Sequence, residues 1–142
     1  MARRKRQYGD GDASFQAAGG EPGIRKWVED FYQIMDTWPE ARRIRDMHPD
    51  DLEISIDKLA RFLCGWLGGP KLYREKYGPI ALPRAHDHLP IDAADRDAWL
   101  ACMDRALALQ PFDDDFKTYL REQLAIPAER VRRVCAGLPA RS

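Results

Sequence analysis

The chain has 142 residues, of which 44% are hydrophobic and 32% charged, so it is an ordinary globular chain with enough apolar residues for one core. Its 23 basic and 23 acidic residues cancel to a formal net charge of zero, which argues against nucleic acid as the main partner. No apolar run reaches the length of a membrane span, which argues against a membrane as well.

The N-terminal residues and the cysteines indicate the domain organisation and the compartment. Residues 1–12 are basic and then rich in glycine and aspartate, so we expect a flexible basic arm. No apolar segment follows Arg3–Arg6, although a secretory signal would require one. The three cysteines are far apart, which favours reduced thiols in a cytoplasm. We expect one domain over 13–138 and a flexible tail over 139–142.

The first half of the chain predicts two long helices and two short ones. A short helix is expected over 12–20, because an aspartate begins it and glycines end it. The first long helix has one apolar stripe and ends at Pro39, after which a short helical segment covers 40–46. The stripe consists of Ile24, Trp27, Val28, Phe31, Ile34 and Met35.

A corner at His48 and Pro49 leads to the second long helix. Asp50 or Asp51 can cap this helix, and the glycines before Pro70 end it. Its expected inward positions are Leu52, Ile56, Leu59, Phe62, Leu63 and Trp66.

The second half of the chain begins with an irregular segment. Four prolines and three glycines exclude one long helix over 68–99, and this stretch carries two of the three histidines. A helix that begins at Asp92 or Asp95 is expected to run to Leu109, with Trp99, Cys102, Met103, Ala106 and Leu107 in its stripe. A further helix begins at 113, and Pro127 is expected to kink or split it. Since no strand alternation or repeat is found, the sequence predicts an all-α protein.

The histidines are the main candidates for metal ligands. A zinc site needs further ligands near His86 and His88, and no other residue has a suitable spacing. A di-iron site needs inward glutamates paired with histidines, which the chain lacks. Haem iron needs only one protein ligand, because the porphyrin supplies four nitrogens. From spacing alone, a haem ligand and an ordinary surface loop both stay open.

Three segments together resemble the group II truncated haemoglobins. The pair Phe31-Tyr32 resembles the distal tyrosine of that family, the stretch 62–70 resembles the end of its distal helix, and 96–103 is similar to its tryptophan-bearing helix. The resemblance covers roughly residues 13–125. It implies a truncated globin fold, a 2-on-2 helical sandwich around haem b (iron protoporphyrin IX).

The resemblance also implies a single proximal histidine as the iron ligand. In the family this histidine lies thirteen residues before the tryptophan; Trp99 is that tryptophan, so the spacing selects His86. The text from His88 to Ile91 resembles the family's His-x-Pro-Phe, but it requires a two-residue deletion. We therefore assign His86 as the iron ligand and keep His88 as the alternative.

On the distal side, the resemblance implies side chains that contact the bound ligand. Tyr32 and Trp99 match the family's hydrogen-bond donors, which stabilise negative charge on dioxygen and slow its release. His48 stands where the family often has a tyrosine, and three roles stay open for it: bonding to the ligand, closing the sixth position of the iron, or facing solvent. Ser55 replaces the distal histidine of myoglobin-like globins and is too small to block entry.

Further residues are candidates for contact with the haem itself. Those expected to pack on the haem face are Leu59, Phe62 and Leu63. Those placed to bind the propionates, from position only, are Lys58, Tyr73 and Arg84.

The implied function is reversible binding of dioxygen and other diatomic ligands, NO and CO, for oxygen storage, sensing or transport. The alternative is a redox enzyme that performs NO dioxygenation or peroxidase-like chemistry with an external reductase. The same two distal donors suit both functions, so the sequence does not separate them. A haem-free sensor domain would follow if neither histidine bound iron. We expect a monomer or a weak dimer.

Overall fold

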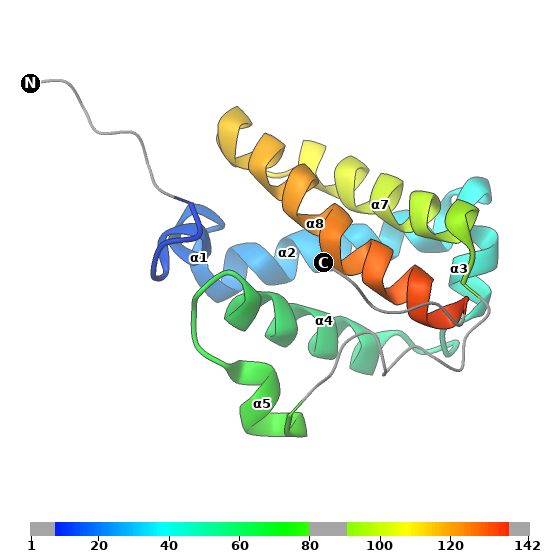
Figure 1. Ribbon diagram of the computed structural model, residues 1–142, viewed down its shortest axis with the longest axis horizontal. Coiled ribbons are helices and arrows are strands. Elements are labelled where there is room, and N and C mark those ends of the chain that lie inside the picture. Colours follow the sequence, from blue (N-terminus) through cyan, green and yellow to red (C-terminus); the bar gives the residue numbers. More distant parts are fainter. Residues whose placement is uncertain (1–7, 80–90, 137–142) are drawn as a thin grey trace, which may run out of the picture.

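The computed structural model describes residues 8–79 and 91–136, and every regular element in these two ranges is helical (Figure 1). The elements are α1 (Ala13–Ala17), α2 (Gly20–Thr37), the 3-10 turn η1 (Pro39–Ala41), α3 (Arg42–Asp46), α4 (Glu53–Trp66), α5 (Leu72–Tyr77), α7 (Ala93–Ala108) and α8 (Asp114–Cys135). The prediction of an all-α fold is confirmed. In the described part of the chain, no helix has the length and apolar character needed to span a bilayer.

Helix α2 is the centre of the fold. It packs against α4 on one side and against α7 on another, and α7 in turn packs against α8 (Figure 1). The pair α2 and α4 therefore lies on the pair α7 and α8, which is a 2-on-2 arrangement. The apolar stripe of α2 explains its central position, because one helix face has to meet two neighbours.

The core confirms most of the predicted inward residues. The fully buried side chains of α2 are Ile24, Trp27, Val28, Phe31, Tyr32 and Met35, so only Ile34 of the predicted stripe stays half-buried. Helix α7 buries Cys102, Met103, Ala106 and Leu107, and α8 adds Phe116, Leu120 and Leu124. Burial of large apolar side chains such as these is the main source of stability.

Two glycines allow close backbone contacts near the start of the fold. A Cβ atom on Gly23 would lie 1.8 Å from the carbonyl oxygen of Ala18, and one on Gly68 would lie 1.9 Å from that of Gly11. Gly68 also has a φ of +90°, a conformation that favours glycine. Beside it, the N–H of Phe15 donates to the carbonyl of Leu67 at 3.0 Å. These contacts join α1 to the start of α2 and to the end of α4.

The structure differs from the sequence predictions in α8 and α5. Helix α8 continues through Pro127 to Cys135, so the expected split does not occur. Its later part is joined to α7 by an ion pair of 2.6 Å between Arg96 and Glu129. Helix α5 was not expected at all. It occupies a stretch without proline or glycine inside the segment predicted to be irregular.

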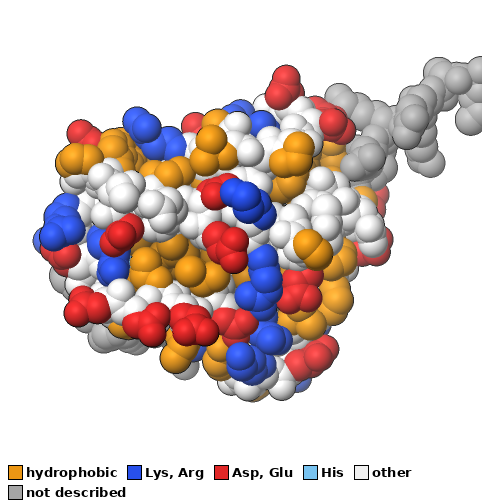
Figure 2. Space-filling model, turned by 180° about the vertical axis from the view of Figure 1, so that it is seen from behind, with side chains coloured by type: hydrophobic (Ala, Val, Ile, Leu, Met, Phe, Trp, Pro, Cys, Tyr) orange, Lys and Arg blue, Asp and Glu red, His pale blue; other side chains and the backbone are white. Residues whose placement is uncertain are grey.

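The surface opposite to the view of Figure 1 carries both signs of charge. Figure 2 shows acidic and basic side chains interspersed around an apolar area on this face. A mixed distribution is what the formal net charge of zero leads one to expect. This face therefore has no extended field of one sign of the kind that steers nucleic acid.

Candidate functional site

Helix α4 carries a row of large apolar side chains that are only half-buried. Its fully buried residues are Ala60, Leu63 and Cys64. The half-buried apolar residues that pack against the core are Ile56, Leu59, Phe62 and Trp66. Such a row is typical of the wall of a ligand pocket, which is apolar and incompletely covered by the protein itself.

Tyr32 of α2 presents a buried polar group near this wall. The residue is 6% exposed, and its ring meets that of Phe31 edge-on with centroids 4.8 Å apart. Within residues 8–79 and 91–136 the Tyr32 hydroxyl makes no hydrogen bond. Burial raises the pKa of Tyr32, so the hydroxyl stays protonated and acts as a donor. The oxygen keeps some accessible surface, so this donor is open to a ligand that provides the acceptor.

Trp99 lies on the other side of Phe31. The two rings meet edge-on with centroids 5.5 Å apart, and Trp99 is half-buried. The core tryptophan Trp27 is different, because its indole N–H donates to the carbonyl of Met103 at 3.4 Å. Trp99 makes no such bond to any residue of the described ranges. Its N–H is therefore available to a ligand beside Tyr32.

The start of α7 is fixed by a reciprocal cap, and this fixes the position of Trp99. The carboxylate of Asp92 accepts from the N–H of Asp95 at 2.9 Å, and the carboxylate of Asp95 accepts from the N–H of Asp92 at 3.1 Å. The Asp95 carboxylate, which is 4% exposed, also pairs with Arg43 of α3 at 2.9 Å. This ion pair joins α3, which leads into the corner at His48, to α7, which carries Trp99.

His48 lies at that corner, next to Tyr32. The two rings are nearly perpendicular, with centroids 5.6 Å apart. The Nδ1 atom of His48 lies 2.8 Å from the carbonyl oxygen of Ile44. A carbonyl oxygen only accepts, so Nδ1 carries the proton, while Nε2 accepts in the neutral ring and donates in the charged ring.

The remaining predicted residues lie along α4 and α5. Ser55, Leu59 and Phe62 are half-buried on α4, whereas Leu63 is fully buried in the core beside them. Lys58 is exposed, and its Nζ atom lies 5.3 Å from the ring centroid of Tyr77. Tyr73 of α5 is half-buried, with its ring centroid 5.1 Å from that of Tyr77. Two of the three predicted propionate residues, Lys58 and Tyr73, thus share one neighbour.

The predicted iron ligand lies outside the described residues. His86, its alternative His88 and the propionate candidate Arg84 all fall within 80–90. Their assignments stay predictions. In the ranges that the structure does describe, no three histidine, cysteine or acidic side chains gather into a metal site.

The described residues fit haem. The half-buried apolar row on α4 suits a flat apolar ring, the exposed Lys58 suits a carboxylate at its edge, and the buried hydroxyl of Tyr32 suits a polar ligand at its centre. A 2-on-2 helical fold with these side chains defines the class of the protein as a globin.

Comparison with known proteins identifies the family within this class. The family model of the bacterial-like globins matches residues 13–132. A group 2 truncated haemoglobin of Bacillus subtilis is 30% identical over 120 residues, which cover 84% of this chain and 88% of that protein.

Solved structures agree with this match. A group II 2-on-2 haemoglobin from Agrobacterium tumefaciens has a TM-score of 0.80 at 34% identity and covers 93% of this chain and 98% of its own. A cold-adapted truncated haemoglobin from Pseudoalteromonas haloplanktis has a TM-score of 0.80 at 33% identity, over 83% of this chain and 95% of its own. The chain belongs to the bacterial-like globin family, and within it to the group II truncated haemoglobins.

Two residues near the site were not singled out from the sequence. Asp57 lies on α4 next to Lys58, and Tyr77 lies on α5. The hydroxyl of Tyr77 donates to the carboxylate of Asp57 at 2.6 Å. The only local signal was the spacing of Tyr73 and Tyr77, four residues apart, which places both rings on one face of a helix.

Proposed function

We propose that this globin binds one haem b per chain and reversibly binds dioxygen, NO and CO. Iron in the haem supplies the bond to the diatomic ligand, and the protein supplies the surroundings of that ligand. The observation that carries the proposal is the Tyr32 hydroxyl, which has no acceptor among the described residues and belongs to a side chain only 6% exposed on α2, the helix that packs against α4 and its half-buried apolar row.

The distal donors act on the charge of the ligand. Dioxygen gains partial negative charge when it binds ferrous iron, so a donated hydrogen bond stabilises the bound form more than the free form. Tyr32 and Trp99 are the two donors on this side. His48 keeps three possible roles here: bonding to the ligand, closing the sixth position of the iron, or facing solvent.

Entry to the distal side passes the small Ser55 on α4. The apolar side chains of Leu59 and Phe62 exclude water from the haem face, which slows loss of an electron from the ferrous state. His86 provides the proximal bond in this proposal, and Lys58, Tyr73 and Arg84 bind the propionates.

A haemin titration of the purified chain tests the proposal. We expect saturation at one haem per chain and, after reduction, a five-coordinate ferrous spectrum. A six-coordinate ferrous spectrum without added ligand would still support haem binding and would place His48 or Tyr32 on the iron. Absence of stoichiometric binding would refute the proposal.

The rate of dioxygen release then separates binding from catalysis. Fast release supports storage or delivery in a cytoplasm. Very slow release, with rapid consumption of NO by the oxygenated protein when a reductant is supplied, would support NO dioxygenation instead. Rapid reduction of peroxide by the ferric form would support a peroxidase-like reaction.

A further inference from the structure

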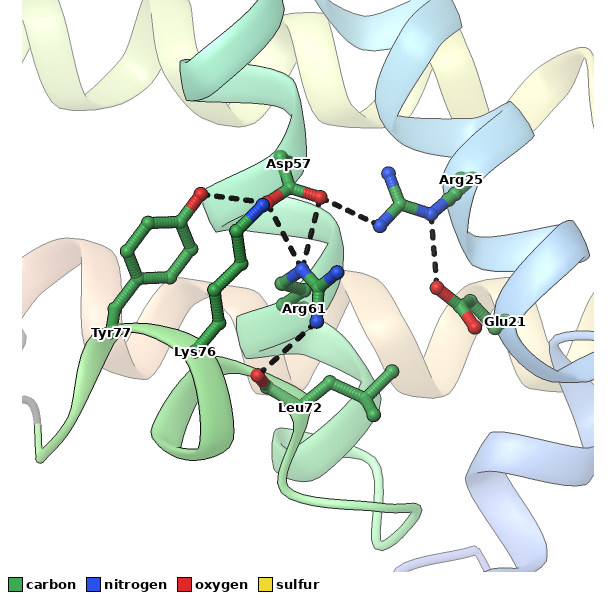
Figure 3. A network of polar contacts seen from close by, with 7 residues as sticks. All are labelled: Glu21, Arg25, Asp57, Arg61, Leu72, Lys76 and Tyr77. Carbon is green, nitrogen blue, oxygen red and sulfur yellow. Dashed lines mark hydrogen bonds and ion pairs between the residues drawn. The ribbon is translucent and has the colours of Figure 1, made fainter.

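The Asp57 carboxylate is the centre of a polar network between three helices. It accepts hydrogen bonds from Arg25 of α2 at 2.8 Å, from Arg61 of α4 at 3.0 Å, and from Lys76 and Tyr77 of α5 at 2.8 and 2.6 Å. Figure 3 shows α5 reaching this carboxylate from one side and α2 reaching it from the other. The Asp57 side chain is only 18% exposed.

Helix α5 depends on this network for its position. None of its residues is fully buried, so apolar burial contributes little to its docking. Its other contacts among the described residues include the half-buried Leu72, a long hydrogen bond of 3.5 Å from Arg61 to the Leu72 carbonyl, and the position of Lys58 over the Tyr77 ring. The two short bonds from Lys76 and Tyr77 to Asp57 are therefore the strongest links between α5 and α4.

The protonation states suit this role. Burial opposes a charged Asp57, but the hydrogen bonds from Lys76, Tyr77, Arg25 and Arg61 outweigh it and hold the pKa of Asp57 well below its usual range. The bond to Asp57 raises the pKa of Tyr77, so its hydroxyl stays a donor. The link is thus complete throughout the neutral pH range.

The Tyr77 ring carries the link to the predicted haem residues. The Nζ atoms of Lys58 and Lys76 each lie 5.3 Å from its centroid, which is within the range of a cation–π contact. The ring of Tyr73 packs against it at 5.1 Å. Lys58 and Tyr73, the two described candidates for the propionates, therefore both contact the Tyr77 ring. The hydroxyl of Tyr77 is in turn bonded to Asp57.

We propose that Asp57 is a positioning residue for haem: it docks α5 on α4 through Tyr77, keeps Lys58 and Tyr73 at the rim of the pocket, and so slows the loss of haem. This inference rests on the proposed function, because it requires that haem binds. Asp57 itself contacts only protein groups in the network, so its effect on haem is indirect.

Two measurements on the full chain test this role. Haemin loss from the haem-loaded protein is measured by transfer to an excess of a haem-accepting apoprotein. Docking of α5 is measured by the rate of tryptic cleavage after Lys71 and Arg74 in the full chain before haemin is added, so that bound haem does not affect this rate.

The central variant is Asp57→Asn, which keeps the shape of the side chain and removes its charge. We expect haemin loss to accelerate about tenfold and cleavage at α5 to accelerate with it, because several charge-assisted bonds weaken together. Tyr77→Phe keeps the ring and loses one bond, so about threefold faster loss is expected. Asp57→Glu keeps the charge, and both rates should lie close to those of the original chain.

The matched control is Asp104→Asn, which removes an exposed ion pair between α7 and α8, that of Asp104 with Arg121. Both rates should stay unchanged in it. Unchanged cleavage in Asp57→Asn would overturn the docking of α5 by this carboxylate. Faster cleavage with unchanged haemin loss would overturn the positioning role while leaving the proposed function intact. If the original chain took up no haem, the proposed function would fail first, and the cleavage rates would still decide the docking.

Discussion

Replacement of Tyr32 by phenylalanine is expected to stabilise the haem-free chain and to weaken dioxygen binding. The hydroxyl of Tyr32 is almost fully buried and has no hydrogen-bond partner in the described residues. A fully buried hydroxyl without a partner costs about 1–3 kcal/mol, but the Tyr32 oxygen is not among such fully buried atoms, so its cost is smaller. Tyr32→Phe should therefore raise the free energy of unfolding by less than about 1 kcal/mol.

In the haem-loaded protein the same change removes a donor to the ligand. A net hydrogen bond is worth about 0.5–1.5 kcal/mol, so dioxygen should leave roughly three- to tenfold faster. Urea unfolding followed by far-UV circular dichroism measures the first effect, and stopped-flow displacement of dioxygen by CO measures the second. A more stable haem-free chain together with weaker dioxygen binding distinguishes Tyr32 from an ordinary core tyrosine.

Tyr77→Phe is the matched control for stability, because the Tyr77 hydroxyl has an acceptor 2.6 Å away. Loss of the Tyr77 hydroxyl should lower the free energy of unfolding, whereas loss of the Tyr32 hydroxyl should not. Equal destabilisation by both changes would refute the reasoning, since Tyr32 would then have a protein partner. Unchanged dioxygen release in Tyr32→Phe would assign the donor role to Trp99.

Three further predictions concern the cap of α7, a close backbone contact and the proximal bond. Asp95→Ala should destabilise the chain by about 2 kcal/mol in urea unfolding, because a buried carboxylate loses its cap and its ion pair, whereas the exposed Asp97→Ala should change it by less than about 0.5 kcal/mol. Gly23→Ala should cost about 3 kcal/mol in the same assay, because the added Cβ meets backbone. His86→Ala should lose the five-coordinate ferrous spectrum and His88→Ala should keep it; the reverse would shift the assignment by two residues.

The long helices were predictable because each one buries a continuous stripe. The stripe of α2 from Ile24 to Met35 is visible in the sequence at three- and four-residue spacing, and the structure buries nearly all of it. The start of α7 was predictable for a local reason too, because Asp92 and Asp95 form a cap within one turn. In both cases the determining contacts lie close together in the chain or repeat along it.

Helix α5 and the passage of α8 through Pro127 were not predictable by such rules. Helix α5 has no fully buried residue, and the carboxylate that docks it lies twenty residues before Tyr77 in the chain. The continuation of α8 is supported by Glu129, whose partner Arg96 lies thirty-three residues earlier. Contacts between helices stabilise both elements, so the local pattern of prolines and glycines does not predict them correctly.

The candidate site likewise contains some residues that the sequence predicts and others that it does not. Tyr32 and Trp99 were found through family resemblance, and the structure adds the physical reason to consider them, namely a buried hydroxyl and an indole N–H without described acceptors. The donor direction of His48 was not visible in the sequence, because it depends on the carbonyl of Ile44 one helical turn away. The network around Asp57 was missed because it joins three helices.

The two sides of α4 are therefore stabilised by different kinds of interaction. Toward α2 it buries Ala60, Leu63 and Cys64, and burial of this kind is insensitive to salt. Toward α5 it relies on one carboxylate whose charged partner on α5, Lys76, is half-exposed, and dissolved salt screens such a contact. Tyr32, proposed as a distal donor, is thus held by the apolar core, whereas Tyr73, proposed to bind a propionate, lies on a helix held by the weaker polar link.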